Sequence, residues 1–299
     1  MKPTISIITI VKNDRGIAET LDGLEKQEKP APTEIIVVDA SAPALLEDIR
    51  EKHPDVRWHQ FVPLPGKKKT SIPEQRNVGI RLAQGDIVVF IDANCVPSPH
   101  WLSDLVAPIL DGSETMAAGS VRAANSKTYV NIKPEDDEKD EYLATAPTIN
   151  LAFKKETWEQ AGGFDESFLF GSDGDFTWRC HKAGNRIRFV RSASVTHDWG
   201  SLKDEIKRSY RYGKARTDIF RKHPELLREL VGGNSYILIY TIYFLGLPLT
   251  LYVWWYPLII VLAFLKNAKN HPFKTVFMNV IYTFGVWVEL VKLFFSAIF

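Results

Sequence analysis

Two oxygen-bearing side chains, Asp92 and Asn94, stand two residues apart directly after an apolar segment. That segment, residues 87–91, is continuously apolar and rich in β-branched residues, which is typical of a strand buried on both faces of a parallel sheet. Open α/β sheets bind ligands at the carboxyl ends of their strands, and carboxylate and amide oxygens suit a hard divalent cation that carries a diphosphate. A capped strand end followed by a turn would use the same residue types, so both interpretations stay open here.

Further carboxylates and one histidine occupy similar positions along the chain. Asp39 ends a second apolar segment, and Asp173 and Asp175 follow a glycine and begin a predicted helix. Acidic residues are favoured in the first turn of a helix, but one would be enough for capping, so a catalytic or binding role is the alternative. His197 follows a predicted strand and is either structural or a metal ligand beside the acidic site.

Basic residues that could face a phosphate precede the central strand. Lys67 lies in a basic, glycine-containing loop at 65–70, which by itself is better explained as a solvated run of charge. Arg76 and Asn77 lie in the first turns of a predicted helix over 74–83 and could reach a ligand near the strand ends. The acidic segment 135–141 is interpreted as a solvated loop, with a gate over an acceptor site as the alternative.

The elements that must position these residues alternate between strands and helices. Strands are expected at 4–11, 34–39, 56–61 and 87–91, and helices at 17–27, 45–52 and 74–83. After the central strand we expect helices at 101–110 and 155–161 and strands at 117–121, 148–153 and 186–190. Short strands that alternate with helices predict a doubly wound α/β domain.

Composition limits the possible classes of protein. The chain has 299 residues and a formal net charge of +1, which argues against a nucleic-acid partner. Two cysteines, Cys95 and Cys180, provide neither a disulfide framework nor metal-ligand spacing and suit a reducing compartment. A strand-like segment begins near the N-terminus without a signal sequence, so the first part of the chain is expected to stay in the cytosol.

The last third of the chain has a membrane-like composition. Residues 201–228 hold nine basic residues with interspersed aromatics, which predicts a helix on an anionic membrane surface rather than a solvated helix. Arg211 and Arg216 in this segment could meet the donor diphosphate or a lipid phosphate. Residues 236–265 carry no charge but are interrupted at Gly246–Pro248 and at Pro257, and basic residues flank both sides.

This charge pattern places both ends of segment 236–265 in the cytosol. We therefore expect a hairpin that dips into the bilayer, ahead of one tilted span. The second apolar stretch, 275–299, either spans the membrane or lies in its interface. A buried helical domain in a soluble protein is the alternative for the whole tail.

The motifs in chain order resemble those of the inverting glycosyltransferases of family 2, which have the GT-A fold. The resemblance covers about residues 4–200 and rests on these segments: Ser6-Ile7-Ile8 with Asn13, 34–39, Arg76-Asn77-Val78-Gly79, Asp92-Ala93-Asn94, Gly162-Gly163-Phe164-Asp165-Glu166 and Ser172-Asp173. Asn94 stands where the family has the last Asp of Asp-x-Asp, Ser172 where it has Glu, and Val11 where it usually has Thr. Six motifs in order are a specific match.

The resemblance implies roles for particular residues. It makes Asp173 the catalytic base, and it implies an Mg²⁺ or Mn²⁺ ion held by Asp92, Asn94 and His197. It also implies a nucleotide-reading role for Asp39. The full set of expected substrate-binding residues is Val11, Asn13, Asp39, Lys67, Arg76, Asn77, Asp92, Asp175, Arg211 and Arg216.

The implied architecture is an α/β GT-A domain at 1–200 with a mostly parallel central sheet, basic amphipathic interface helices at 201–232 and hydrophobic membrane helices at 233–299. The implied activity is inverting transfer of a sugar from a nucleoside diphosphate sugar to a lipid-linked or polysaccharide acceptor. It would take place at the cell membrane, with the catalytic domain on the cytoplasmic side. A polyprenyl-phosphate sugar synthase and a non-catalytic protein that binds a nucleotide sugar are the alternatives.

Overall fold

The computed structural model describes residues 3–63, 71–124, 142–233, 235–268 and 271–298. The chain divides into two compact units, which are described separately. The first comprises residues 1–126 and 130–198, and the second comprises 127–129 and 199–299.

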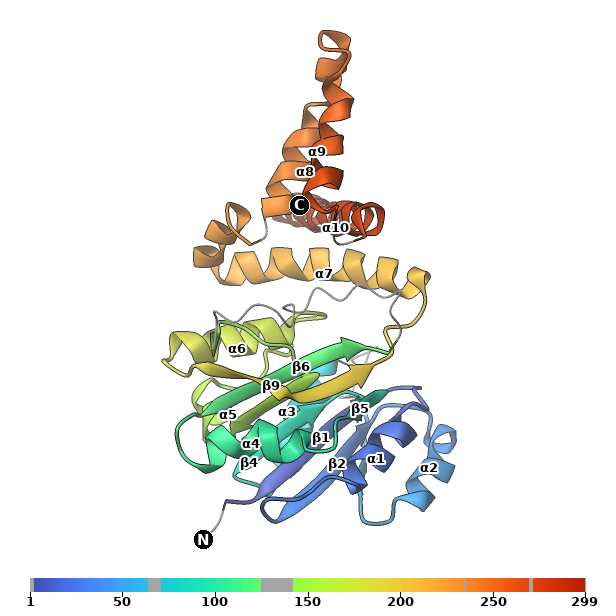
Figure 1. The fold of residues 1–299 in the computed structure, drawn as a ribbon, viewed down its shortest axis with the longest axis vertical. Helices are drawn as coiled ribbons and strands as arrows, with labels where there is room; N and C mark the ends of the chain where they lie inside the picture. The colour runs from blue at the N-terminus through green and yellow to red at the C-terminus, as the bar shows by residue number, and fades with distance from the viewer. Residues whose placement is uncertain (1–2, 64–70, 125–141, 234, 269–270, 299) are drawn as a thin grey trace. The chain divides into compact units, whose positions relative to one another are not determined.

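The first unit is built on a nine-stranded sheet with the order β3-β2-β1-β4-β8-β6-β9-β5, and β7 pairs with β9 (Figure 1). The strands are β1 (Ile5–Val11), β2 (Thr33–Asp39), β3 (Arg57–Gln60), β4 (Ile87–Ile91), β5 (Cys95–Pro97), β6 (Met116–Ala123), β7 (Tyr142–Leu143), β8 (Asn150–Lys154) and β9 (Ile187–His197). β1 pairs in parallel with β2 and β4, β2 with β3, and β6 with β9. Most paired residues are therefore parallel, as predicted, although β8 runs antiparallel between β4 and β6.

Helices cover both faces of this sheet. They are α1 (Ile17–Glu25), α2 (Glu47–Lys52), α3 (Ile72–Leu82), α4 (Trp101–Leu110), α5 (Lys155–Gln160) and α6 (Ser172–Lys182). The main core forms where α3 and α6 pack on one face, with Ile80 and Phe176 against Ile8, Phe90 and Leu151. On the opposite face, the α4 residue Trp101 donates a hydrogen bond from Nε1 to Asn150 Oδ1 over 2.8 Å.

Two strands differ from their sequence-based predictions. The sequence predicted a strand only over 186–190, but β9 continues to His197. The exposed residues Arg191 and Ser192 interrupt the apolar pattern of the strand. They lie where the pairing with β6 shifts in register, at Gly119/Ser120. β5 was not predicted: Pro97 and Pro99 exclude a continuation of β4, but the chain turns and forms a separate short edge strand on β9.

The second unit consists of helices. It contains α7 (Leu202–Lys222), α8 (Ser235–Leu245), α9 (Ile260–Lys266) and α10 (Pro272–Ile298), with 3-10 segments at Pro224–Leu230, Leu247–Leu251 and Tyr256–Ile259. The predicted interruptions at 246–248 and 257 coincide with two of the 3-10 segments. Tyr243 and Tyr256 join the arms of a hairpin, because each hydroxyl donates to a carbonyl of the other arm over 3.0 Å.

One helix among the described residues is long and apolar enough to cross a membrane. It is Pro272–Ser296, within α10, and 28% of its apolar window is buried inside the structure.

Candidate active site

Sheet topology brings the ends of distant strands to one edge. β1, β2 and β4 are mutually parallel, so Val11, Asp39 and Ile91 end at the same edge. β6 and β9 run antiparallel to β8, which is itself antiparallel to β4, so β9 also ends at that edge, with His197. Asp92 follows β4 directly, and the polar residues that end distant strands therefore converge.

Asp92 has charged neighbours from three other elements. Burial raises the pKa of its carboxyl group, electrostatic interactions with Arg76 and His197 lower the pKa, and the neighbouring Asp173 raises it. Contacts link the four side chains: Arg76 Nη1 donates to Ser172 Oγ, next to Asp173, and His197 Nδ1 lies 3.0 Å from the carbonyl oxygen of Asn94, two residues after Asp92. We refer to Asp92, Asp173, Arg76 and His197 as one cluster.

Asn94 and His197 are held next to Asp92 by backbone geometry. Asn94 has a left-handed backbone with φ of 65°, and β5 begins at the next residue, where Cys95 pairs with His197. Nδ1 of His197 lies 3.0 Å from the Asn94 carbonyl oxygen and 3.4 Å from Cys95 Sγ. The tautomer with the proton on Nδ1 can donate to that carbonyl.

The turn after β1 is shaped to this arrangement. A Cβ atom on Gly16 would lie 2.7 Å from both Cγ and Oδ1 of Asn94, so the Asn94 side chain occupies the space that glycine leaves. Asn94 can therefore keep its position only if residue 16 has no side chain.

Asp173 stands at the start of α6, opposite Arg76 of α3. Asp173 is partly exposed and its Oδ1 accepts only a 3.0 Å hydrogen bond from the next backbone N–H, of Gly174, among the bonds observed. The neighbouring Ser172 Oγ accepts a 3.0 Å hydrogen bond from Arg76 Nη1. Arg76 is 8% exposed, and its buried Nε has no hydrogen-bond partner among the described residues. The side chain thus keeps a donor for an anionic ligand.

Four phenylalanines hold these site residues in place. Phe90 of β4, Phe153 of β8, Phe164 and Phe176 of α6 form a continuous cluster with ring centroids 4.3–6.1 Å apart. Phe90 precedes Asp92 by two residues and Phe176 follows Asp173 by three, while the Arg76 guanidinium lies 5.5 Å from the centroid of Phe164. One packed cluster of rings therefore positions the carboxylates of Asp92 and Asp173 and the guanidinium of Arg76.

Asp39 is the last residue of β2 and pairs with Val11, the last residue of β1. It is buried, and its carboxylate accepts hydrogen bonds from Ser41 N at 2.7 Å and Trp58 Nε1 at 3.2 Å. Val11 is buried at the end of β1, and the exposed Asn13 has φ of 57° and donates from its backbone to Ser41 Oγ. These three residues lie together, as expected for one subsite.

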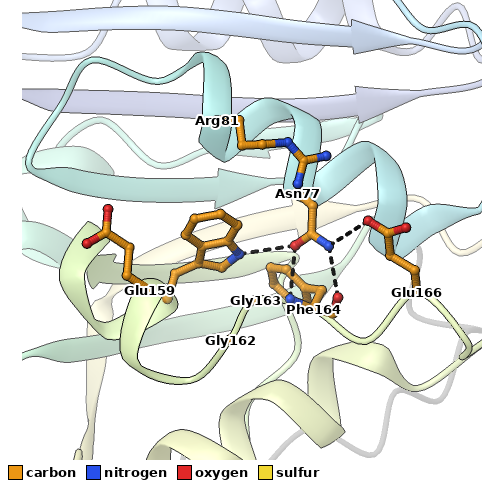
Figure 2. Close-up of a pocket in the computed structure, with 8 residues that line it drawn as sticks. Asn77, Arg81, Glu159, Gly162, Gly163, Phe164 and Glu166 are labelled. Atoms are coloured by element: carbon orange, nitrogen blue, oxygen red, sulfur yellow. Dashed lines mark hydrogen bonds between the residues drawn. The ribbon is translucent and has the colours of Figure 1, made fainter.

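The Asn77 side chain, predicted to contact substrate, makes its hydrogen bonds within the protein. Its Oδ1 accepts from Phe164 N and Trp158 Nε1, and its Nδ2 donates to Phe164 O and Glu166 Oε1, over 2.8–3.1 Å (Figure 2). The amide is therefore saturated. These residues line a cavity of about 400 Å³ whose rim also includes Arg81.

Asp175 likewise has a structural partner. The side chain is fully buried, and its Oδ2 accepts from Nε and Nη2 of Arg179 at 3.0 and 2.8 Å. Arg179 also donates to the carbonyl oxygens of Ala161 and Gly163. The ion pair of Asp175 and Arg179 thus connects α6 to the loop after α5. Of the two acidic residues at the start of α6, Asp173 lies near Asp92, whereas Asp175 is ion-paired.

The remaining predicted residues lie elsewhere. Lys67 and the acidic segment 135–141 are outside the described residues. Arg211 and Arg216 belong to the second unit, where Arg211 is exposed on α7. Arg216 donates to the Tyr282 hydroxyl at 3.0 Å and pairs with Glu229 at 3.3 Å.

Sequence reasoning missed several residues that support the site. Cys95, Ser41 and Trp58 touch predicted site residues, but none belongs to a recognisable motif. A second candidate cation-binding group among the described residues consists of Asp22, Glu25 and His53. In that group, His53 Nδ1 lies 2.6 Å from Glu25 Oε1, and a direct hydrogen bond between the two side chains explains this distance without a bound ion.

Comparisons with known proteins identify the family and the fold. The family described as "Glycosyl transferase family 2" matches residues 6–171. The chain is 24% identical over 247 residues to the pre-mycofactocin glycosyltransferase of Mycobacterium tuberculosis, covering 76% of this chain and 50% of that protein. It is 23% identical over 248 residues to glycosyltransferase AglE of Haloferax volcanii, covering 79% of this chain and 81% of AglE. The chain thus spans about half the length of the mycobacterial relative.

A solved structure resembles most of the chain. The mannosyltransferase PcManGT from Pyrobaculum calidifontis, in complex with GDP-Man and Mn²⁺, matches with a TM-score of 0.70 at 19% identity, over 97% of this chain and 88% of that one. At this identity the likeness establishes the fold. The prediction of a GT-A-type α/β fold is confirmed.

Proposed function

The chain belongs to glycosyl transferase family 2, and on that premise we propose that it transfers a sugar from a nucleoside diphosphate sugar to an acceptor hydroxyl with inversion at the anomeric carbon. The observation that carries the proposal is the cluster of Asp92, Asp173, Arg76 and His197, drawn from four separate elements. The similarity to a mannosyltransferase in complex with GDP-Man and Mn²⁺ supports the donor class.

The donor set fits a divalent cation. Asp92 and Asn94 offer oxygen atoms and His197 offers an imidazole nitrogen, a mixed set that suits Mn²⁺ better than Mg²⁺. Burial raises the pKa of Asp92 and so makes its ionised form unfavourable. A bound cation would offset this effect by stabilising the ionised carboxylate. When bound, the ion would neutralise charge on the diphosphate leaving group.

Asp173 serves as the general base in this proposal. Its carboxylate accepts the proton of the acceptor hydroxyl while the acceptor oxygen forms a bond to the anomeric carbon and the bond from that carbon to the diphosphate breaks. Arg76, with an unpaired Nε beside this point, stabilises negative charge on the diphosphate. Asp39, Val11 and Asn13 form the subsite for the nucleotide base.

A lipid-linked or polysaccharide acceptor is proposed because the same chain carries an apolar tail, which would keep the enzyme at a membrane. A hydroxyl acceptor needs a base, whereas a polyprenyl phosphate is already ionised at neutral pH. Because Asp173 lies near Asp92 and can act as such a base, we favour a hydroxyl group as the acceptor.

The test is transfer by the purified full-length protein, given a panel of nucleotide sugars, a membrane lipid extract and either Mn²⁺ or Mg²⁺. Asp173→Asn should bind the donor like wild type but lose turnover by about 100-fold or more. Glu156→Gln, at an exposed position on α5, is the matched control and should keep wild-type turnover. Wild-type turnover in Asp173→Asn would refute the base, and donor binding without transfer or hydrolysis would indicate a non-catalytic binder.

A further inference from the structure

Helices α7 and α10 lie side by side and point in the same direction. Lys274 pairs with Glu205 at 2.8 Å near the start of both helices, and Lys214 pairs with Glu289 at 3.0 Å further along. In addition, Ser209 Oγ donates to Met278 O, and Thr217 Oγ1 donates to Val286 O. From Lys274 to Glu289, roughly 22 Å at about 1.5 Å per residue, α10 is therefore attached to α7.

Two glycines bring the helix backbones together. A Cβ atom on Gly213 of α7 would lie 1.9 Å from the Tyr282 carbonyl oxygen. One on Gly285 of α10 would lie 2.3 Å from the Tyr210 carbonyl oxygen. The two helices thus form one unit that cannot be separated without losing this contact.

The two faces of α10 differ in polarity. The buried face contains Thr275, Thr283 and Glu289 in addition to apolar residues. The exposed face carries an apolar stripe at helical spacing: Phe273, Phe277, Phe284, Val291 and Phe295. A polar face covered by protein and an apolar face left open fits a helix whose open face lies against lipid.

Helix α7 is too highly charged to accompany α10 across a bilayer. Its exposed basic residues are Lys203, Lys207, Arg211, Arg221 and Lys222. Charged side chains are strongly unfavourable at the bilayer centre, but basic residues bind anionic headgroups. Because α10 is attached to α7 over most of the thickness of a hydrocarbon core, α10 can cross only if α7 crosses with it.

The hairpin of α8 and α9 is a better candidate for insertion. Its turn carries strongly exposed apolar side chains, with Leu251, Tyr252 and Trp254 exposed by 85, 88 and 80%. The first arm, residues 235–251, is roughly 25 Å long, against a hydrocarbon core of about 30 Å. Trp and Tyr at its turn are the residue types that concentrate at membrane interfaces.

We infer that α10 does not cross the membrane. It lies in the interface of an anionic bilayer beside α7, and only the hairpin of α8 and α9 enters the hydrocarbon core. Both ends of the hairpin, α7 and the whole of α10 then face the same side of the membrane.

The test is cysteine labelling of the full-length protein in sealed vesicles of phosphatidylcholine and phosphatidylglycerol in about a 2:1 ratio. The variants are Lys203→Cys on α7 as the same-side reference, Lys292→Cys near the end of α10, and Trp254→Cys at the hairpin turn. Cys95 and Cys180 are buried, and burial raises the pKa of the Cys180 thiol to about 12, so wild type provides the blank. The probe is a membrane-impermeant maleimide.

Lys292→Cys should be labelled to the same extent as Lys203→Cys, and Trp254→Cys at least about ten-fold less until detergent is added. Labelling of Lys292→Cys only after detergent would overturn the inference, since α10 would then span. Full labelling of Trp254→Cys in intact vesicles would also overturn it, because the hairpin would lie outside the bilayer. The readout does not depend on transfer activity, so it stands apart from the proposed reaction.

Discussion

Replacing Asn77 by alanine should destabilise the first unit instead of specifically weakening donor binding. Asn77 makes four hydrogen bonds, two of them to the N–H and C=O of Phe164, which is 2% exposed. Trp158 and Glu166 are partly exposed and can turn to water, but the backbone groups of Phe164 cannot. Each buried group left unpaired costs about 1–3 kcal/mol, so we expect a loss of about 2–6 kcal/mol.

This loss is measurable as a shift in melting temperature. A domain of this size shifts by about 2–4 °C per kcal/mol, so the expected decrease is on the order of 10 °C. Arg81→Ala is the control, because Arg81 lies on the same helix and lines the same cavity but is exposed. It should change stability by less than about 0.5 kcal/mol.

Donor affinity separates the two explanations for Asn77. If Asn77 contacts the donor, Asn77→Ala will raise the Kd for the nucleotide sugar while the melting temperature stays at the wild-type value. That pair of results would refute the structural role. A lowered melting temperature with an unchanged Kd at a temperature where the variant is folded supports it.

Three further predictions concern other parts of the chain. Asp92→Asn should raise the melting temperature of the metal-free protein at pH 7 while abolishing transfer. Burial and, to a smaller extent, a neighbouring carboxylate raise the pKa of Asp92 and so make its ionised form unfavourable in the folded state. A lower melting temperature would contradict this. Asp175→Ala should lower the free energy of unfolding, measured by chemical denaturation, by about 3–5 kcal/mol, since it leaves Arg179 without its buried partner. An unchanged denaturation midpoint would argue against a stabilising ion pair. Gly213→Val should make the second unit sensitive to protease at low protease concentration, whereas Gly233→Val, where a Cβ meets nothing within 4 Å, should not; equal resistance would refute the close helix contact.

The first half of the sheet could be predicted from sequence because its strands carry their own signal. The strand predicted at 87–91 is β4, Ile87–Ile91, since five apolar residues bounded by turn residues leave little ambiguity. β5 carried no such signal. It has three residues beside two prolines, and its partner β9 ends 102 residues later in the chain, at His197.

Residue type alone could not separate site residues from structural ones. Asp173 and Asp175 share a residue type and a helix turn, and only the position of Arg179 shows that one of them is ion-paired. Asn77 belongs to the motif that suggested substrate binding, yet its amide is saturated by the Phe164 segment. Long-range partners decide such cases, and they follow from tertiary structure. The roles of Asp39, Asp173 and the proposed metal ligands stay predictions until they are measured.

The phenylalanine cluster has a consequence for how the enzyme can diversify. Phe90 lies two residues before one carboxylate and Phe176 three residues after the other, and Phe153 and Phe164 pack with both rings. A change in ring volume would displace both carboxylates at once, so natural variants should rarely alter donor preference through these four positions. New specificities are expected to arise in the connections beyond the strand ends, where substitutions can be tolerated one at a time.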